Sequence, residues 1–299
     1  MHFVSVYLFP GTLHAVNLHP IAQTSDTLLA VTLLHLLHSV SADCAAKRNV
    51  TGSDVILLMG QSNMGGRGLG YDAELDGPNN PRIQQWSRAN TTITASERLE
   101  HADLGTVSQT YVGMGTAFGR AYVETLPVNR NVLLVPTAYR GTQLVDGPWS
   151  VGGNLFEDAV TRMELALATN EVGENCVAAV LWHQGESDAG AHIDQETYQS
   201  TWTGMINTLR ARIPAAAEAP VVLGEFTPAW IASNQALAEP ILSAIRAIPD
   251  IVPFTAVATS DCLLSNSHDD NIHFDATSQR AYGQRYFDRL GEAIRNRQQ

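Results

Sequence analysis

The chain has few cysteines, and this shortage excludes some classes of site. Its 299 residues include three cysteines, Cys44, Cys176 and Cys262, and no two of them form a C-x-x-C pair. Zinc sites and thiol redox centres of the common type need such closely spaced cysteines, so neither is expected. One disulfide can form if the protein is exported; otherwise the cysteines are expected to be small core residues.

Positive charge is also scarce. The chain has 18 Lys and Arg against 30 Asp and Glu, which gives a net charge of −12 and a pI of about 5.2. Such an acidic chain is a poor partner for phosphate backbones and anionic lipid head groups. The composition therefore argues against nucleic acid as a partner and against stable membrane association, and it leaves the oligomeric state open.

The N-terminal 50 residues offer only a short apolar run. Residues 27–40 form this run, which histidines interrupt, and no Lys or Arg precedes Lys47. The run is too short for a membrane span but resembles a signal-peptide core, and the small residues 41–46 could be a cleavage site. We interpret residues 1–50 as an N-terminal extension with a candidate signal segment. A secreted or extracytoplasmic protein is predicted; the alternative is a cytoplasmic one with a poorly ordered extension.

The rest of the chain, residues 51–299, alternates strand-like apolar runs with helical patterns. Continuous apolar runs are typical of strands buried on both faces, and their alternation with helices predicts a parallel sheet. We predict a single domain, a three-layer α/β fold with a doubly wound sheet of about five parallel strands. The predicted strands are 54–59, 131–136, 177–182, 220–226 and 251–258. The predicted helices are 115–126, 154–169, 195–213, 234–248 and 276–296, whereas residues 63–110 are predicted to be a long loop region.

Ser62 follows the first predicted strand, within the sequence GQSN. A serine there can expose its hydroxyl at the carboxyl edge of the sheet, near N–H groups that face an oxyanion; the alternative is a helix cap. Asp270 and His273 stand three residues apart before the last predicted helix. In a compact turn, Asp270 can orient the imidazole, which then accepts a proton from Ser62. Asp269 is the alternative carboxylate, and stabilisation of the helix entry is the alternative role for the pair.

A middle cluster follows the third predicted strand. It places four polar side chains within six residues: His183, Gln184, Glu186 and Asp188. The spacing of His183 and Glu186 could suggest a metal site, but it is not H-E-x-x-H and no predicted helix aligns the ligands, so no metal is expected. The amide of Gln184 is a suitable oxyanion donor, because its NH2 carries two hydrogens and no charge. The two carboxylates are expected to anchor loops.

These blocks resemble the SGNH hydrolase superfamily, and most closely its sialate O-acetylesterase-like branch, which includes the plant-type acetylesterases of carbohydrate esterase family six. The resemblance covers residues 54 to about 297 and implies an SGNH-type, flavodoxin-like fold. The similar segments are GQSNMGGRG (60–68), VGMGTAFGR (112–120), PTAYRGTQLVDGPW (136–149), WHQGESDA (182–189) and DNIHFD (270–275).

The resemblance implies roles for individual residues. Ser62 would be the nucleophile, His273 the general base and acid, and Asp270 the carboxylate that orients it. The implied oxyanion donors are the Ser62 N–H, a glycine N–H near Gly113 or Gly115, and the Gln184 side chain. The implied supporting residues are Gln61, Asn63 and Glu186.

The resemblance also has a departure that bears on substrate choice. Where the family commonly has Gly-Gly-Thr or Gly-Gly-Ser, this chain has Arg140-Gly141-Thr142. An arginine there could narrow the pocket or contact an acidic sugar. We therefore expect substrate contacts at Arg67, Arg140 and Thr142.

The predicted function is a serine esterase that removes O-acetyl groups from carbohydrates, of the acetylxylan or sialate type, without a metal or an organic cofactor. A general short-chain esterase, lipase or thioesterase is the first alternative, because the same scaffold hosts those activities. A non-catalytic carbohydrate-binding protein is the second, since the five tryptophans could offer stacking faces.

Overall fold

The centre of the molecule is a seven-stranded sheet in the order β3-β2-β4-β1-β5-β6-β7. The structure is a computed structural model that describes residues 41–105, 111–169 and 174–297. All neighbouring strands are parallel except the edge pair β2 and β3. The strands are β1 (Gly52–Gly60), β2 (Ile83–Trp86), β3 (Thr92–Thr94), β4 (Arg130–Pro136), β5 (Cys176–His183), β6 (Val221–Gly224) and β7 (Thr255–Ala258).

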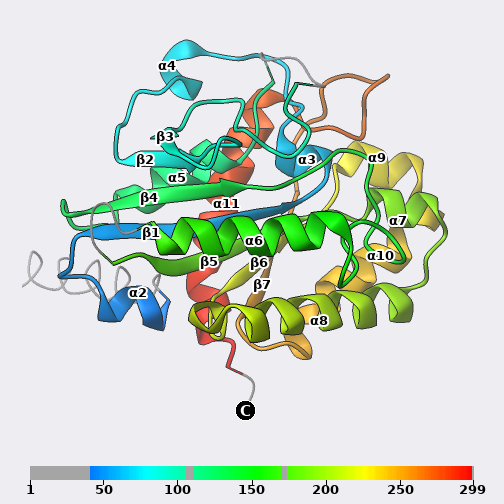
Figure 1. The fold of residues 1–299 in the computed structure, drawn as a ribbon. Helices are drawn as coiled ribbons and strands as arrows, with labels where there is room; N and C mark the ends of the chain where they lie inside the picture. Colours follow the sequence, from blue (N-terminus) through cyan, green and yellow to red (C-terminus); the bar gives the residue numbers. More distant parts are fainter. Residues whose placement is uncertain (1–40, 106–110, 170–173, 298–299) are drawn as a thin grey trace, which may run out of the picture.

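Helices cover both faces of this sheet (Figure 1). One core joins the sheet to α6, α8 and α10, and the other joins it to α5 and α11. This three-layer α/β arrangement confirms the predicted fold class. The helices are α2 (Ala42–Ala46), α3 (Ser62–Gly65), α4 (Ala73–Asp76), α5 (Gly115–Val123), α6 (Asn154–Ala168), α7 (Glu186–Gly190), α8 (Gln195–Arg212), α9 (Pro228–Ser233), α10 (Gln235–Ala247) and α11 (Ala276–Arg295), with short 3-10 turns at Pro214–Ala216 and Ile248–Asp250.

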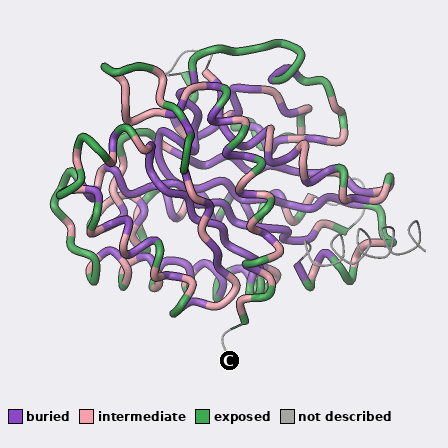
Figure 2. The backbone as a smooth tube through the Cα atoms, turned by 180° about the vertical axis from the view of Figure 1, so that it is seen from behind, coloured by how far each residue is buried: buried purple, intermediate pink, exposed green. Residues whose placement is uncertain are grey.

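The central strand β1 shows why its sequence is continuously apolar. Val55 and Leu57 point into the core beneath α6 and α8, whereas Ile56 and Leu58 point into the core beneath α5 and α11. All four side chains are fully buried, because successive residues of a strand face opposite sides of the sheet. Figure 2 shows the same strands as a continuous buried centre, with the exposed segments around them.

Two strands lie in the region that was predicted to be a long loop. β2 extends the sheet by pairing in parallel with β4, and β3 pairs with β2 to form an antiparallel edge. The prediction for residues 63–110 was therefore wrong at these two strands, and also at the short helices α3 and α4. Both strands are short, and Gln84 and Gln85 break the apolar pattern of β2, so local periodicity could not reveal them.

The segment 41–50, which the sequence analysis set apart from the domain, packs against it. Cys44 forms a disulfide with Cys176 at the start of β5, and the Ser41 hydroxyl donates a hydrogen bond to the Val177 carbonyl at 2.6 Å. The cross-link spans 132 residues of sequence. Cross-links over such distances stabilise a fold by roughly 2–5 kcal/mol. Cys262 is free and exposed.

The remainder of the predicted extension, residues 1–40, lies outside the described residues. The apolar run 27–40 falls in it, so the signal segment stays a prediction. Within the described ranges, no helix is both long and apolar enough to cross a membrane.

Candidate active site

The first feature of the site is the sharp exit from β1. Gly60 has a φ of 132°, and a Cβ at this position would collide with the His183 carbonyl of the adjacent strand. Only glycine therefore fits, and the Gln61 N–H donates to that same carbonyl at 2.9 Å. The chain then turns directly into α3. This turn places Ser62 at the carboxyl edge of the central strand, as the sequence analysis expected.

The structure brings Ser62, His273 and Asp270 into one hydrogen-bonded row. The Nε2 atom of His273 lies 3.0 Å from Ser62 Oγ, and its Nδ1 atom lies 2.7 Å from Asp270 Oδ1. Asp270 Oδ2 accepts a further hydrogen bond from the Asn266 side chain at 2.8 Å. The neighbouring Asp269 points away, because its side chain is fully exposed and its Oδ1 lies 3.4 Å from His268 Nδ1. Asp270 is therefore the carboxylate that meets the imidazole.

The Asn63 side chain, in the block that carries Ser62, forms hydrogen bonds with both of the other polar blocks. Its side-chain NH2 donates to Glu186 at 2.8 Å and to the Ile272 carbonyl at 2.9 Å, while its Oδ1 accepts the Phe274 N–H at 3.2 Å. The residues on both sides of His273 are thus fixed to the turn that carries Ser62. This agrees with the supporting role expected for Asn63 and Glu186.

His183 and Glu186 form a buried pair rather than an open ligand set. His183 Nδ1 lies 2.9 Å from the Tyr286 hydroxyl, and its Nε2 lies 3.6 Å from Glu186. Burial favours a higher pKa for Glu186, but the adjacent imidazole and the Asn63 hydrogen bond outweigh it and hold that pKa below its usual value. In the described part of the chain, the one cluster with metal-ligand spacing is Cys44, Asp54 and Cys176, where the two thiols form the disulfide.

Gln184 does not occupy the position expected of an oxyanion donor. Its side chain is fully buried, and its NH2 donates to Asp188 and, at 3.0 Å, to the Thr142 carbonyl. Its Oε1 accepts from the Tyr198 hydroxyl at 3.1 Å. Both amide hydrogens are thereby used within the protein. Gln184 therefore stabilises the loop at Thr142 and does not face the serine. This differs from the expectation that its NH2 donates to the oxyanion.

Gln61 faces the cavity in its place. Gln61 is one of the residues that border the cavity beside Ser62, and its Oε1 lies 3.4 Å from the Gln184 NH2. Among the described residues, none accepts a hydrogen bond from the Gln61 NH2. From the sequence, Gln61 was expected only to support the turn. The side-chain direction that separates the two glutamines is set by the fold, so no sequence signal could have shown it.

The two glycines expected to donate to the oxyanion are engaged in other contacts. The Gly113 N–H donates to buried Glu97 at 2.8 Å, and a Cβ at Gly115 would lie 2.6 Å from Leu99 and 2.8 Å from Leu58. Burial raises the pKa of Glu97, although hydrogen bonds from Thr116 and Gly113 oppose the rise. Glu97 therefore anchors the glycine block. It lies in the segment that was predicted to be a loop, where an isolated glutamate gave no sign of this role.

The hydroxyl of Ser62 opens onto a cavity of about 390 Å³. Arg67 reaches this cavity, but its guanidinium donates to Asp103 at 2.7 Å and to the Gly66 carbonyl, so its charge is paired inside the protein. Thr142 does not line this cavity and instead faces a neighbouring one. The cavity is bordered by Gln61, Ser62, Arg67, Arg140, Gly141, Glu186, Ser187, Ile272 and His273.

The arrangement suits acyl transfer. A serine hydroxyl can pass its proton to an imidazole that a carboxylate orients, and the oxygen can then attack a carbonyl carbon. The cavity leaves room for a small acyl group and for part of the group that carries it.

Comparison with known proteins places the chain among carbohydrate esterases. Residues 52–292 match the model of the family described as "Carbohydrate esterase, sialic acid-specific acetylesterase". A probable carbohydrate esterase of Arabidopsis thaliana is 34% identical over an alignment of 175 positions, which covers 53% of this chain and 63% of that protein. The match therefore spans less than two thirds of that relative.

Solved structures show the same fold. The crystal structure of NanS superposes with a TM-score of 0.71 at 20% identity, covering 83% of this chain and 99% of that one. The structure of the Arabidopsis thaliana protein gives 0.62 at 24% identity, covering 80% and 99%. A carbohydrate acetylesterase from Xanthomonas citri gives 0.52 at 18% identity, covering 81% and 55%.

Proposed function

The chain belongs to the carbohydrate esterase family of sialic acid-specific acetylesterases, and from that membership we propose that it hydrolyses O-acetyl esters of carbohydrates with Ser62 as its nucleophile. The observation that supports this most directly is the row Asp270–His273–Ser62, which ends in the cavity. In this proposal, the protein is a carboxylic ester hydrolase.

The reaction uses this row in two steps. Ser62 Oγ attacks the acetyl carbonyl carbon while His273 Nε2 takes the hydroxyl proton, and the carbonyl oxygen becomes an oxyanion. The bond from the acetyl carbon to the sugar oxygen then breaks, and His273 returns the proton to that oxygen. Water attacks the acetylated Ser62 in the second step, with His273 again as base, and acetate leaves.

Gln61 is the side-chain donor to the oxyanion in this mechanism. It adjoins Ser62, it borders the cavity, and its NH2 has no acceptor among the described side chains and carbonyls. The Ser62 backbone N–H is the second donor. An uncharged amide suits this role, because it stabilises the developing charge without carrying charge of its own.

Replacing Gln61 by alanine should lower kcat by roughly 100- to 1,000-fold while KM changes little, because the donor acts mainly on the transition state. Steady-state kinetics on p-nitrophenyl acetate measure both constants. Ser187→Ala is the matched control, since this polar side chain borders the same cavity and has no role in the mechanism. An effect of Gln61→Ala on KM alone would show that Gln61 only holds the substrate.

The substrate class is tested by acetate release from the full chain. Acetylated xylan, O-acetylated sialic acid and p-nitrophenyl acetate are compared with p-nitrophenyl octanoate. We expect release from at least one glycan and from the short ester, with little hydrolysis of the octanoate, because charged and polar side chains border the cavity. Faster octanoate hydrolysis would favour a lipase, and glycan binding without release would favour a binding protein.

A secreted or extracytoplasmic location is part of the proposal. The Cys44–Cys176 disulfide supports it, because disulfides persist mainly in oxidising compartments. The same bond supports counting residues 41–50 with the esterase domain.

A further inference from the structure

A second cavity shares a wall with the active-site cavity. Arg140 and Gly141 line the active-site cavity, whereas Tyr139 and Thr142, their neighbours on either side, line the second one. The second cavity has a volume of about 350 Å³. Pockets of ~300–1,000 Å³ are typical for small ligands. The segment 139–142 is thus a partition between two spaces that are each large enough for a ligand.

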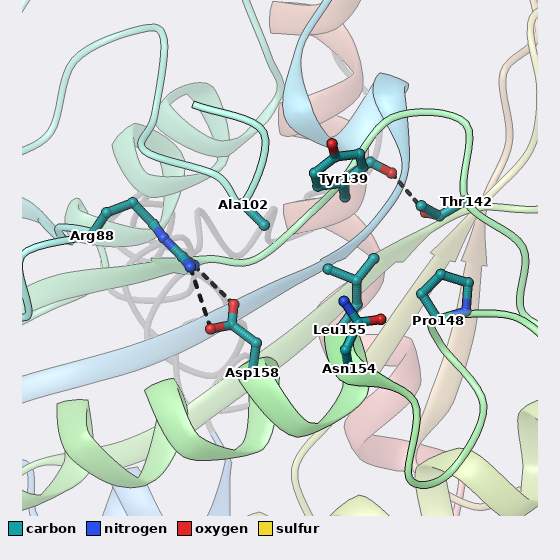
Figure 3. Close-up of a pocket in the computed structure, with 8 residues that line it drawn as sticks. All are labelled: Arg88, Ala102, Tyr139, Thr142, Pro148, Asn154, Leu155 and Asp158. Atoms are coloured by element: carbon teal, nitrogen blue, oxygen red, sulfur yellow. Dashed lines mark hydrogen bonds and ion pairs between the residues drawn. The ribbon is translucent and has the colours of Figure 1, made fainter. Parts of the chain in front are cut away.

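The lining of the second cavity combines apolar surface with paired charge. Figure 3 shows Tyr139 and Leu155 around the space, with Arg88 and Asp158 joined at its edge. The Arg88–Asp158 ion pair has an N–O distance of 2.8 Å, so the two charges compensate each other. The Asn154 side chain adds an uncharged amide. Flat apolar faces suit the C–H face of a sugar ring, and planar polar groups suit its hydroxyls. The paired charges favour a neutral sugar over an acidic one.

The partition is fixed to the catalytic turn. The Tyr139 N–H donates to the Gly60 carbonyl at 3.0 Å, directly before Gln61 and Ser62. At the other end, the Thr142 carbonyl accepts from Gln184, and the Thr142 hydroxyl donates to the Tyr139 carbonyl at 2.6 Å. A group bound in the second cavity therefore has a fixed position relative to the Ser62 nucleophile.

The partition carries no side chain at Gly141, which borders the active-site cavity. Gly141 has a φ of 63°, and a Cβ at this position would meet nothing within 4 Å. With no side chain at this position, a bound chain can cross the partition.

We propose that the second cavity is a glycan subsite, which binds a neutral sugar residue of the same chain whose acetyl group lies at Ser62. This inference rests on the proposed function and narrows its substrate to acetylated oligosaccharides or polysaccharides. Acetylated monosaccharides would fill only the first cavity and would be poorer substrates.

The test compares two variants of the subsite with a matched control. Asp158→Ala and Tyr139→Ala alter the second cavity. Glu157→Ala is the control, because Glu157 neighbours Asp158 on α6 and also pairs with an arginine, Arg212 at 2.6 Å, yet does not line the cavity. The substrates are p-nitrophenyl acetate and acetylated xylose, mannose and sialic acid, each of the sugars as a monosaccharide and within an oligosaccharide. Acetate release gives kcat/KM for each.

For the glycan that is deacetylated, kcat/KM for the oligosaccharide should exceed that for the monosaccharide by roughly tenfold or more. Both subsite variants should remove this advantage by raising KM, whereas Glu157→Ala should keep it, and all three should hydrolyse p-nitrophenyl acetate normally. Equal rates on the two glycan lengths, or an advantage that survives both variants, would overturn the subsite and leave the proposed function standing. Release from p-nitrophenyl acetate and from no glycan would contradict the proposed function, and the subsite would fall with it.

Discussion

Ser62→Ala is expected to lower kcat for acetate release by at least ~10⁴-fold, because no other group can form the acyl intermediate in the proposed mechanism. Within the described ranges, the side-chain hydrogen bond of Ser62 Oγ is the one to His273 Nε2, at 3.0 Å. The substitution removes one oxygen atom and this hydrogen bond, so the unfolding midpoint should stay close to that of the unmutated chain. Release from p-nitrophenyl acetate and from the best glycan substrate measures the effect.

The control for this experiment is Ser187→Ala, which removes a second serine hydroxyl from the same cavity. It should leave kcat unchanged. A Ser62→Ala protein that is folded and retains full activity would exclude the serine mechanism. If activity is lost and the unfolding midpoint also falls, the Ser62→Cys variant is measured next, because it keeps a nucleophile at the same position.

Asp270→Asn should lower kcat by roughly 10⁴-fold through a change of tautomer at His273. The Asn266 NH2 donates to Asp270 Oδ2 at 2.8 Å, so an asparagine would turn its oxygen toward Asn266 and its NH2 toward His273. The imidazole Nδ1, 2.7 Å from the former Oδ1, would then have to accept a hydrogen bond. Its proton would move to Nε2, which could no longer take the proton of Ser62.

The adjacent carboxylate supplies the matched control. Asp269→Asn makes the same chemical change one residue away, on a side chain that is fully exposed. Its kcat should equal that of the unmutated protein. A large loss in Asp269→Asn with none in Asp270→Asn would reverse the assignment of the orienting carboxylate. Kinetics on p-nitrophenyl acetate with both variants decide the question.

The sequence was most informative about features that a short segment of the backbone determines by itself. The apolar run of β1 and the glycine that ends it predicted both a two-sided strand and a sharp exit at Ser62. The comparisons and the sheet confirm the family and the α/β fold. The D-x-x-H spacing predicted the pairing of Asp270 with His273, because three residues of a compact turn bring the side chains together.

The sequence was weakest where contacts join distant segments through side chains. Cys44 and Cys176 are separated by 132 residues, and nothing local links them. β2 is a strand because β4 offers it an unpaired edge, not because its own pattern is strongly apolar.

The two glutamines mark the boundary between these cases. Gln61 and Gln184 both stand in family-like blocks at strand ends, and either could donate to an oxyanion on chemical grounds. The order of β1, β4, β5, β6 and β7, and of the long helices between and after them, was determined by the sequence alone, because periodicity and turn chemistry act over a few residues. Which amide borders the cavity was decided only by the tertiary structure. The Gln184 NH2 donates to Asp188 of its own block and to the Thr142 carbonyl, and the fold brings that carbonyl to Gln184 from 42 residues away.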